Sequence, residues 1–253
     1  MSGEDAGTGL PGIVTIVPTV HDLGDETASW LARVSEEARE EHGYFAVALS
    51  GGNTPKALYQ RLTGLPFVDA IAWATWMVFF GDERAVPPDD PQSNYRVACD
   101  ALLQHVPIPP ERIHRMEAER PDLDQAAREY SSLLADTLPR GPGAAPRLHC
   151  MLLGLGENGH IASLFPGTPS LDVQHRWVVP SRADYPPYER LTVTFPVINA
   201  AEFVAIVVSG DTKGAALRGV VDGTVPAARV RPKDGTLLWF LDEAAAASMQ
   251  RTR

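Results

Sequence analysis

The chain has 253 residues, carries 22 Lys and Arg against 32 Asp and Glu, and is 44% hydrophobic. A chain of this length buries a core of its own, and its net charge of −10, with scattered basic residues, argues against a nucleic-acid partner. The longest apolar runs fall far short of the roughly 20 residues that span a bilayer, so we expect no membrane partner.

The two cysteines and residues 1–11 indicate the cellular compartment of the protein. Cys99 lies in a predicted helix and Cys150 in an apolar strand, and both read as small buried hydrophobes in a reducing compartment. No Cys or His group has the spacing of a structural zinc site, so no metal is expected. Residues 1–11 are acidic and glycine-rich and lack the pattern of a secretory signal, which predicts a flexible tail and a cytoplasmic protein.

Periodicity and turn residues predict strands and helices that alternate along the chain. The helix after the first strand, for example, has apolar residues on one face and ends at Gly43. In chain order, the expected elements are strand 12–17, helix 25–43, strand 44–50, helix 56–62, strand 75–80, helix 94–104, helix 123–138, strands 148–154, 176–180, 190–195 and 203–209, helix 212–221 and strand 236–241.

Strands that are apolar throughout and alternate with helices indicate a mostly parallel sheet covered on both faces. We therefore predict a three-layer α/β/α, Rossmann-like fold. The loop 140–146, rich in Gly and Pro, is the only candidate internal boundary. Because the strands on both sides of it need the same sheet, we predict a single α/β domain over residues 12–253.

Ligands of open parallel sheets bind beyond the carboxyl ends of the strands, so the loops at those ends are the candidate site. In the first of these loops, two glycines beside a helix N-terminus let backbone N–H groups approach a phosphate or carboxylate, with Thr54 as the N-cap. An ordinary strand-to-helix turn is the alternative. The loop comprises Ser50, Gly51, Gly52, Asn53, Thr54 and Pro55.

The second loop, 81–84, places three charged residues after a buried strand. Such a triplet is either a surface turn with a salt bridge or part of the crevice, since unpartnered charges are costly inside. In the crevice, Arg84 would bind a phosphate or polarise a carbonyl with its planar fork of donors. Asp82 and Arg84 are our catalytic candidates from this loop.

The third loop, 154–160, matches the Gly-x-Gly-x-x-Gly dinucleotide fingerprint in letters. Its context does not fit, because no room follows for the long crossover helix and no acidic residue ends the next strand. What remains is His160, directly after Gly159, at the mouth of the sheet. Histidine is the commonest general base, although a histidine that packs at a helix start is an open alternative.

The fourth loop, 209–213, ends in Lys213, which falls in the first turn of a predicted helix. The helix dipole repels a cation at that position, and an anionic ligand would relieve the conflict. A solvated lysine is the alternative.

These motifs together resemble the 6-phosphogluconolactonase family, from about Ser50 to Ala247. The shared segments are SGGNTP, FFGDERAVPPDDPQSNY, LLGLGENGHIASLFPGT, ERLTVTFPVINAA, SGDTK and TLLWFLDEAA. The resemblance implies the sheet of glucosamine-6-phosphate isomerase and ribose-5-phosphate isomerase. It also implies hydrolysis of 6-phosphogluconolactone in the oxidative pentose phosphate pathway. Separately, we expect no cofactor, and a monomer or a small homo-oligomer.

The same resemblance assigns roles to residues. His160 would be the general base that activates water, and Arg84 its electrophilic partner, which stabilises the oxyanion. The glycine loop, Gly159 and Lys213 would bind the sugar phosphate, with Arg190 as a weaker candidate. The chain departs from the family at Asn158, where an aspartate is usual, and at Ile161, where a threonine is frequent.

Rival functions share parts of this pattern. An isomerase or deaminase of amino-sugar phosphates has a similar fold and the same Gly-His turn, but its chemistry needs a carboxylate, and the stretch 162–165 after the histidine contains none. A non-catalytic sugar-phosphate sensor would need a DNA-binding module, for which no basic segment is evident. A dinucleotide-binding protein ranks below both.

Overall fold

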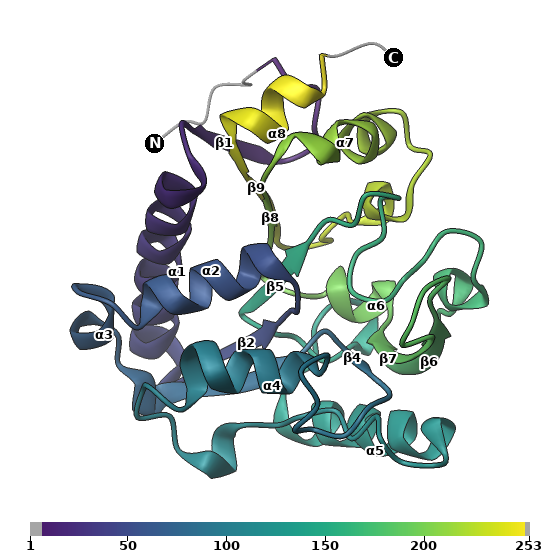
Figure 1. Ribbon diagram of the computed structural model, residues 1–253. Helices are drawn as coiled ribbons and strands as arrows, with labels where there is room; N and C mark the ends of the chain where they lie inside the picture. The colour runs from purple at the N-terminus through teal and green to yellow at the C-terminus, as the bar shows by residue number, and fades with distance from the viewer. Residues whose placement is uncertain (1–6, 251–253) are drawn as a thin grey trace.

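The central layer of the molecule is a parallel sheet (Figure 1). Within residues 7–250, which the computed structural model describes, six strands pair in the order β1-β9-β8-β5-β2-β3, and every pair is parallel. Because the strands run in one direction, their carboxyl ends lie at one edge of the sheet. The strands are β1 (Ile13–Val17), β2 (Phe45–Leu49), β3 (Trp76–Phe80), β5 (Cys150–Gly154), β8 (Phe203–Val208) and β9 (Thr236–Asp242).

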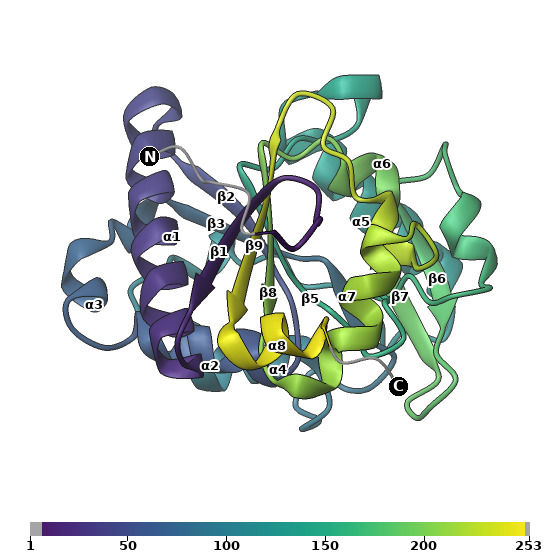
Figure 2. The same cartoon turned by 90° about the horizontal axis from the view of Figure 1, so that it is seen from above.

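Helices cover this sheet, and Figure 2 shows α1 on one side of β9 and β8 and α7 on the other. The apolar faces of the helices pack on strands that are buried along their length, as β2 is at every residue. The predicted layered α/β fold is therefore confirmed. The helices are α1 (Val20–His42), α2 (Asn53–Leu62), α3 (Phe67–Ala70), α4 (Asn94–Ala98), α5 (Leu123–Thr137), α6 (Phe195–Ile198), α7 (Gly214–Val221) and α8 (Glu243–Ser248).

The expectation of one sheet for all strands is wrong. Among the described residues, β4 (Asp82–Arg84), β7 (Glu189–Val193) and β6 (Val178–Arg182) form a second, antiparallel sheet in the order β4-β7-β6. Residues 82–84, expected as a loop, are thus a strand. Hydrophobicity identifies a buried strand but not the strands with which it pairs, and it is the pairing of β7 with β4 and β6 that separates this sheet from the first.

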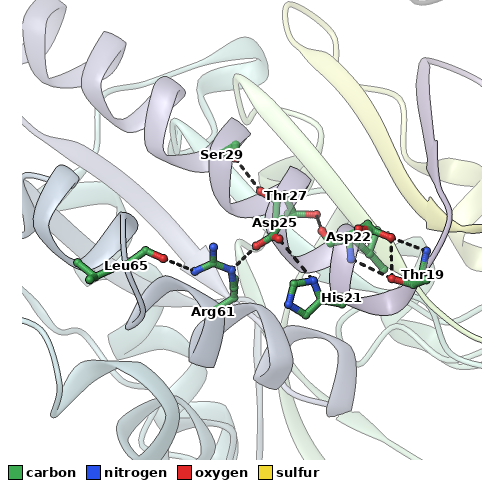
Figure 3. A network of polar contacts seen from close by, with 9 residues as sticks. Thr19, His21, Asp22, Asp25, Thr27, Ser29, Arg61 and Leu65 are labelled. Atoms are coloured by element: carbon green, nitrogen blue, oxygen red, sulfur yellow. Dashed lines mark hydrogen bonds and ion pairs between the residues drawn. The ribbon is translucent and has the colours of Figure 1, made fainter.

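Polar contacts define the start of α1 and attach it to α2, as Figure 3 shows. Thr19 and Asp22 form a capping box, so α1 begins at Val20 rather than at the predicted residue 25. Asp25 on α1 pairs with Arg61 on α2, and Arg61 also donates to the carbonyl of Leu65. These contacts fix α2, whose first turn borders the candidate site described below.

The structure revises several local expectations. The predicted tail 1–11 falls partly outside the described residues, but Leu10 is buried and the carbonyl of Pro11 accepts a hydrogen bond from Trp239 at 2.8 Å, so this end of it is anchored. The predicted helix 94–104 is α4 followed by a π-helical turn, Cys99–Leu103. Within the described part of the chain, both cysteines are free, Cys150 buried and Cys99 half-buried.

No helix within the described residues is both long enough and apolar enough to cross a bilayer.

Candidate active site

A cavity of about 410 Å³ lies beyond the carboxyl ends of β2, β5 and β8, where the loops were predicted to meet. It is lined by nearly all of the predicted site residues, which come from both sheets: Ser50, Gly51, Gly52, Asn53, Thr54, Asp82, Arg84, His160, Arg190 and Lys213. Gly159 is the exception. It is buried behind the cavity, with a φ of 75°, and a Cβ there would overlap Val225, so its role is in the turn.

The glycine loop enters α2 through Gly52, whose φ of 101° is open to glycine and strained for other residues. Gly52, not Thr54, is the N-cap, which corrects the prediction. Thr54 lies inside the first turn, and its Oγ1 is 2.7 Å from Oγ of Ser209 on the fourth loop. A Cβ on Gly51 would overlap the amide of Asn94. The loop therefore brings backbone and the N-terminal end of the α2 dipole to the cavity.

His160 sits in a tight turn in which the N–H of Gly156 donates to its carbonyl. Oδ1 of Asn158 lies 2.5 Å from Nδ1 of the imidazole and accepts a further hydrogen bond from the His160 backbone N–H at 3.2 Å. An amide oxygen only accepts, so the ring proton is on Nδ1 and the lone pair is on Nε2. The alternative of a histidine packed at a helix start is wrong, because the turn leads into no helix.

The electrostatic surroundings keep this ring neutral. Burial is the largest cause that lowers the pKa of His160, Asp82 acts in the opposite direction, and the charges of Lys213 and Arg190 also lower it, with a net result of about 4. The ring of Phe165 lies 4.5 Å from the imidazole, centroid to centroid, and shields one side of it. At neutral pH the side chain is thus an unprotonated base.

Asp82 is held from two sides. Its Oδ2 accepts a hydrogen bond from Oγ of Ser163 at 2.6 Å, and its Oδ1 accepts one from Nδ2 of Asn94 at 3.1 Å. All of these groups are buried. The neighbouring Glu83 points away from the cavity and accepts hydrogen bonds from Ser93 and from the start of α4.

The cationic side of the cavity comes from the second sheet. In the antiparallel pairing of β4 with β7, Arg84 stands directly opposite Arg190. Arg190 is 1% exposed, and its Nη1 has no hydrogen-bond partner among the described residues. Burial and the nearby charge of Arg84 lower its pKa. Like charges that face each other across a strand pair are unfavourable, so anionic groups of a ligand in the cavity would stabilise this arrangement.

Several residues that line the cavity were not predicted from the sequence: Asn94, Ser163, Phe165, Tyr185 and Ser209. The position of Asn94 at the start of a helix could have been predicted, because Ser93 before it is a good N-cap and caps α4 in the structure. No such sequence signal exists for Tyr185. It lies in the turn between β6 and β7, and the guanidinium of Arg190 lies 5.6 Å from its ring centroid.

A separate cluster of possible metal ligands lies at the opposite edge of the main sheet. Within the described residues, the side chains of His42, His149 and Glu202 approach within 4.8 Å of one another. Nδ1 of His149, however, accepts a hydrogen bond from the backbone N–H of Ala46 at 2.9 Å. The neutral ring then carries its proton on Nε2 and has no lone pair left for a metal, so the cluster does not fit a metal site.

Fold and cavity define an α/β protein with a cavity at the carboxyl edge of its sheet that is lined by cations beside a neutral histidine and is suited to a small anionic ligand. The chain belongs to the family described as glucosamine-6-phosphate isomerases/6-phosphogluconolactonase, whose model matches residues 18–239.

The individual proteins to which the chain is similar belong to the same family. The chain is 39% identical over 240 residues to probable 6-phosphogluconolactonase 3, chloroplastic, of Oryza sativa, covering 90% of this chain and 73% of that protein. It is 37% identical to 6-phosphogluconolactonase 3, chloroplastic, of Arabidopsis thaliana, over 93% of this chain and 75% of that protein. The solved 6-phosphogluconolactonase of Trypanosoma brucei superposes with a TM-score of 0.84 at 25% identity, covering 96% of this chain and 100% of that one.

Proposed function

We propose that this protein hydrolyses 6-phosphoglucono-1,5-lactone to 6-phosphogluconate, the lactonase step of the oxidative pentose phosphate pathway. The curated relatives described above carry the name of this activity. The observation that carries the proposal is the facing pair of Arg84 and Arg190, the latter buried with Nη1 unpartnered, in the cavity that holds a neutral His160.

In the proposed reaction, Nε2 of His160 takes a proton from a water molecule as its oxygen attacks C1 of the lactone. The ring is ready for this because it is neutral, with its proton on Nδ1. The imidazolium that results is stabilised by the carboxylate of Asp82, whose charge raises the pKa of His160. Collapse of the tetrahedral intermediate breaks the bond from C1 to the ring oxygen, and the imidazolium returns the proton to that oxygen.

The cations and the glycine loop have the remaining roles. Arg84 stabilises the oxyanion that develops on the C1 carbonyl oxygen. The phosphate is held by the N-terminal turn of α2, by Lys213 and by Arg190, which keeps the lactone carbonyl within reach of the base. All three cations line the same cavity. Lys213 reaches it from the loop after β8, and Arg84 and Arg190 reach it from the second sheet.

The test is a coupled assay in which freshly formed 6-phosphogluconolactone is hydrolysed and 6-phosphogluconate is measured. We expect native protein to accelerate hydrolysis and His160→Ala to lose about 10²- to 10⁴-fold of that acceleration while its circular dichroism is unchanged. His175→Ala, at an exposed histidine, is the control and should retain full activity. An unchanged rate in His160→Ala would remove this residue from the mechanism.

The same preparation tests the isomerase alternative. The family includes glucosamine-6-phosphate isomerases, and their chemistry needs a carboxylate that shuttles a proton between adjacent carbons. In this cavity both oxygens of Asp82 already accept hydrogen bonds. Turnover of glucosamine 6-phosphate without turnover of the lactone would reverse the assignment.

The proposal also covers the cellular compartment, the oligomeric state and the partners of the enzyme. We place it in the cytoplasm, as a monomer or a small homo-oligomer that acts without nucleic acid or membrane partners. The free thiols of Cys99 and Cys150 and the net charge of −10 support this setting. Fractionation and light scattering of native protein would test it.

A further inference from the structure

The loop that carries Lys213 is held by an acidic residue outside the cavity. Asp242, the last residue of β9, is 5% exposed and does not line the cavity. Both of its carboxylate oxygens lie 3.1 Å from the backbone N of Gly210. Its Oδ1 also accepts a hydrogen bond from the N–H of Ala245 at 2.7 Å and so caps α8.

Gly210 is the point where the chain turns from β8 into the Lys213 loop. Its φ of 87° marks the turn, and it is the N-cap of the short helical turn Asp211–Lys213. Ser209 before it and Lys213 after it both line the cavity. A hydrogen bond to the N–H of Gly210 therefore fixes the orientation of the segment that presents both side chains.

The other end of this loop rests on the same C-terminal helix. Gly214, the first residue of α7, lies so close to the carbonyl of Ser248 that a Cβ would overlap it. Arg218 on α7 donates to the carbonyls of Ser248 and Met249 at 3.0 Å. The loop is thus held at both ends by α8 and its cap, although no residue of Glu243–Ser248 lines the cavity.

We propose that Asp242 is a positioning residue for substrate binding: its carboxylate, through the N–H of Gly210, sets the position of Lys213 and Ser209 at the phosphate. The inference rests on the proposed function for the identity of the ligand. It predicts an effect on affinity rather than on the chemical step, because neither Gly210 nor Asp242 lines the cavity and Asp242 is not among the charges that shift the pKa of His160.

The test separates the contact of Asp242 with the Gly210 N–H from its cap of α8. Asp242→Ser keeps an N-cap for α8, since serine is a good cap, but its shorter side chain does not reach Gly210. We expect KM for the lactone to rise about tenfold, kcat to change less than threefold, and the Kd of 6-phosphogluconate and of inorganic phosphate, measured by calorimetry, to rise with KM. Asp242→Asn keeps Oδ1 as an acceptor for Gly210 and Ala245 but replaces the second oxygen near Gly210 with an amide donor, so its effect on KM should be smaller than that of Asp242→Ser.

Two further variants distinguish positioning from a general loss of stability. Glu243→Gln removes an exposed carboxylate from the same helix turn and should leave KM and Kd unchanged. In a Lys213→Ala background, Asp242→Ser should weaken phosphate binding less than twofold, because the cation that it positions is gone and only Ser209 remains to be displaced. Full multiplication of the two effects would overturn the inference.

Other outcomes are equally decisive. If Asp242→Ser lowers only the urea midpoint and binds phosphate as native protein does, the residue is structural and the inference is wrong. A native protein that binds phosphate but does not hydrolyse the lactone contradicts the proposed function alone. Native protein that binds neither phosphate nor 6-phosphogluconate contradicts both.

Discussion

At the scale of single residues, the side-chain amide of Asn158 decides which nitrogen of His160 is basic. Its oxygen fixes the proton on Nδ1, as an aspartate at this position would. Because the amide carries no charge, it does not stabilise the protonated, imidazolium form of His160. The pKa of His160, lowered to about 4 by burial, is therefore not raised again from this side.

Asn158→Asp restores the missing charge and should raise the pKa of His160. A pKa of about 4 leaves the base unprotonated at all higher pH, so kcat/KM of native protein should fall only as pH drops toward 4. In the variant we expect this fall to begin about 0.5 to 1 pH unit higher, a modest shift because position 158 is exposed. The pH profile of kcat/KM measures it.

Asn158→Ala provides the contrast for this prediction. It removes the acceptor without adding charge, so the proton is no longer held on Nδ1 and kcat should fall by about tenfold, with KM nearly unchanged. An acid limb of Asn158→Asp that coincides with that of native protein would show that the residue does not act through the imidazole.

At the scale of elements, the cavity depends on how two sheets meet. The loops after β2, β5 and β8 of the main sheet supply the glycine loop, His160 and Lys213, and the second sheet supplies Arg84 and Arg190. Glu83 connects the second sheet to α4, because its carboxylate accepts hydrogen bonds from Arg84 N, Asn94 N, Tyr95 N and Ser93 Oγ. Burial raises the pKa of Glu83, while these donors favour its ionised form.

Glu83→Gln replaces one acceptor oxygen with a donor amide that faces buried donors. We expect the free energy of unfolding to fall by about 2 kcal/mol, the typical cost of buried groups left unsatisfied. Because Arg84 and Asn94 are attached through Glu83, kcat/KM should fall as well. Urea denaturation and the lactone assay measure the two effects.

Asp89→Asn is the control for this variant, since it removes an exposed carboxylate from the segment between β4 and α4. We expect its stability and activity to match those of native protein. If Glu83→Gln were as stable and as active as Asp89→Asn, the proposed attachment of the second sheet to α4 would be wrong.

Sequence predicts the parts of this arrangement that depend on local chemistry. Apolar runs identified the parallel strands, and the glycines, His160 and Lys213 were found because each follows such a strand. The pairing of Arg84 with Arg190 could not be predicted, since it depends on the register of strands about a hundred residues apart. Thr54 was misassigned as a cap because Gly52, with its positive φ, starts the helix two residues earlier.

At the scale of the whole molecule, the two edges of the main sheet each hold a histidine whose pKa is lowered to about 4, chiefly by burial. At the amino edge, His149 is 6% exposed and stacks between His42 and Phe45. Its ring Nδ1 accepts a hydrogen bond from the backbone N–H of Ala46, and the backbone N–H of His149 donates to the Ala46 carbonyl at 3.0 Å. The imidazole thereby continues the pairing of β2 with β5 for one more residue.

This geometry predicts a loss of stability in acid. Burial, then the charges of His42 and Arg147, lower the pKa of His149 from 6.5 to about 4 in the folded state. Above pH 6.5 the ring is neutral in both states; between 6.5 and 4 only the unfolded chain binds the proton, so stability falls as pH falls. His149 should contribute a slope of up to about 1.4 kcal/mol per pH unit in this window, and about 3 kcal/mol across it.

Replacement of His149 by asparagine isolates that contribution from the similar one of His160. Oδ1 of the asparagine can accept the N–H of Ala46 but does not titrate, and the lost stacking lowers stability equally at every pH. Urea denaturation at pH 4 to 7 should give a slope of stability against pH that is smaller by about one proton for His149→Asn. His175→Asn, at an exposed position, is the control. Parallel curves for native protein and His149→Asn would mean that the ring is not held neutral by the fold.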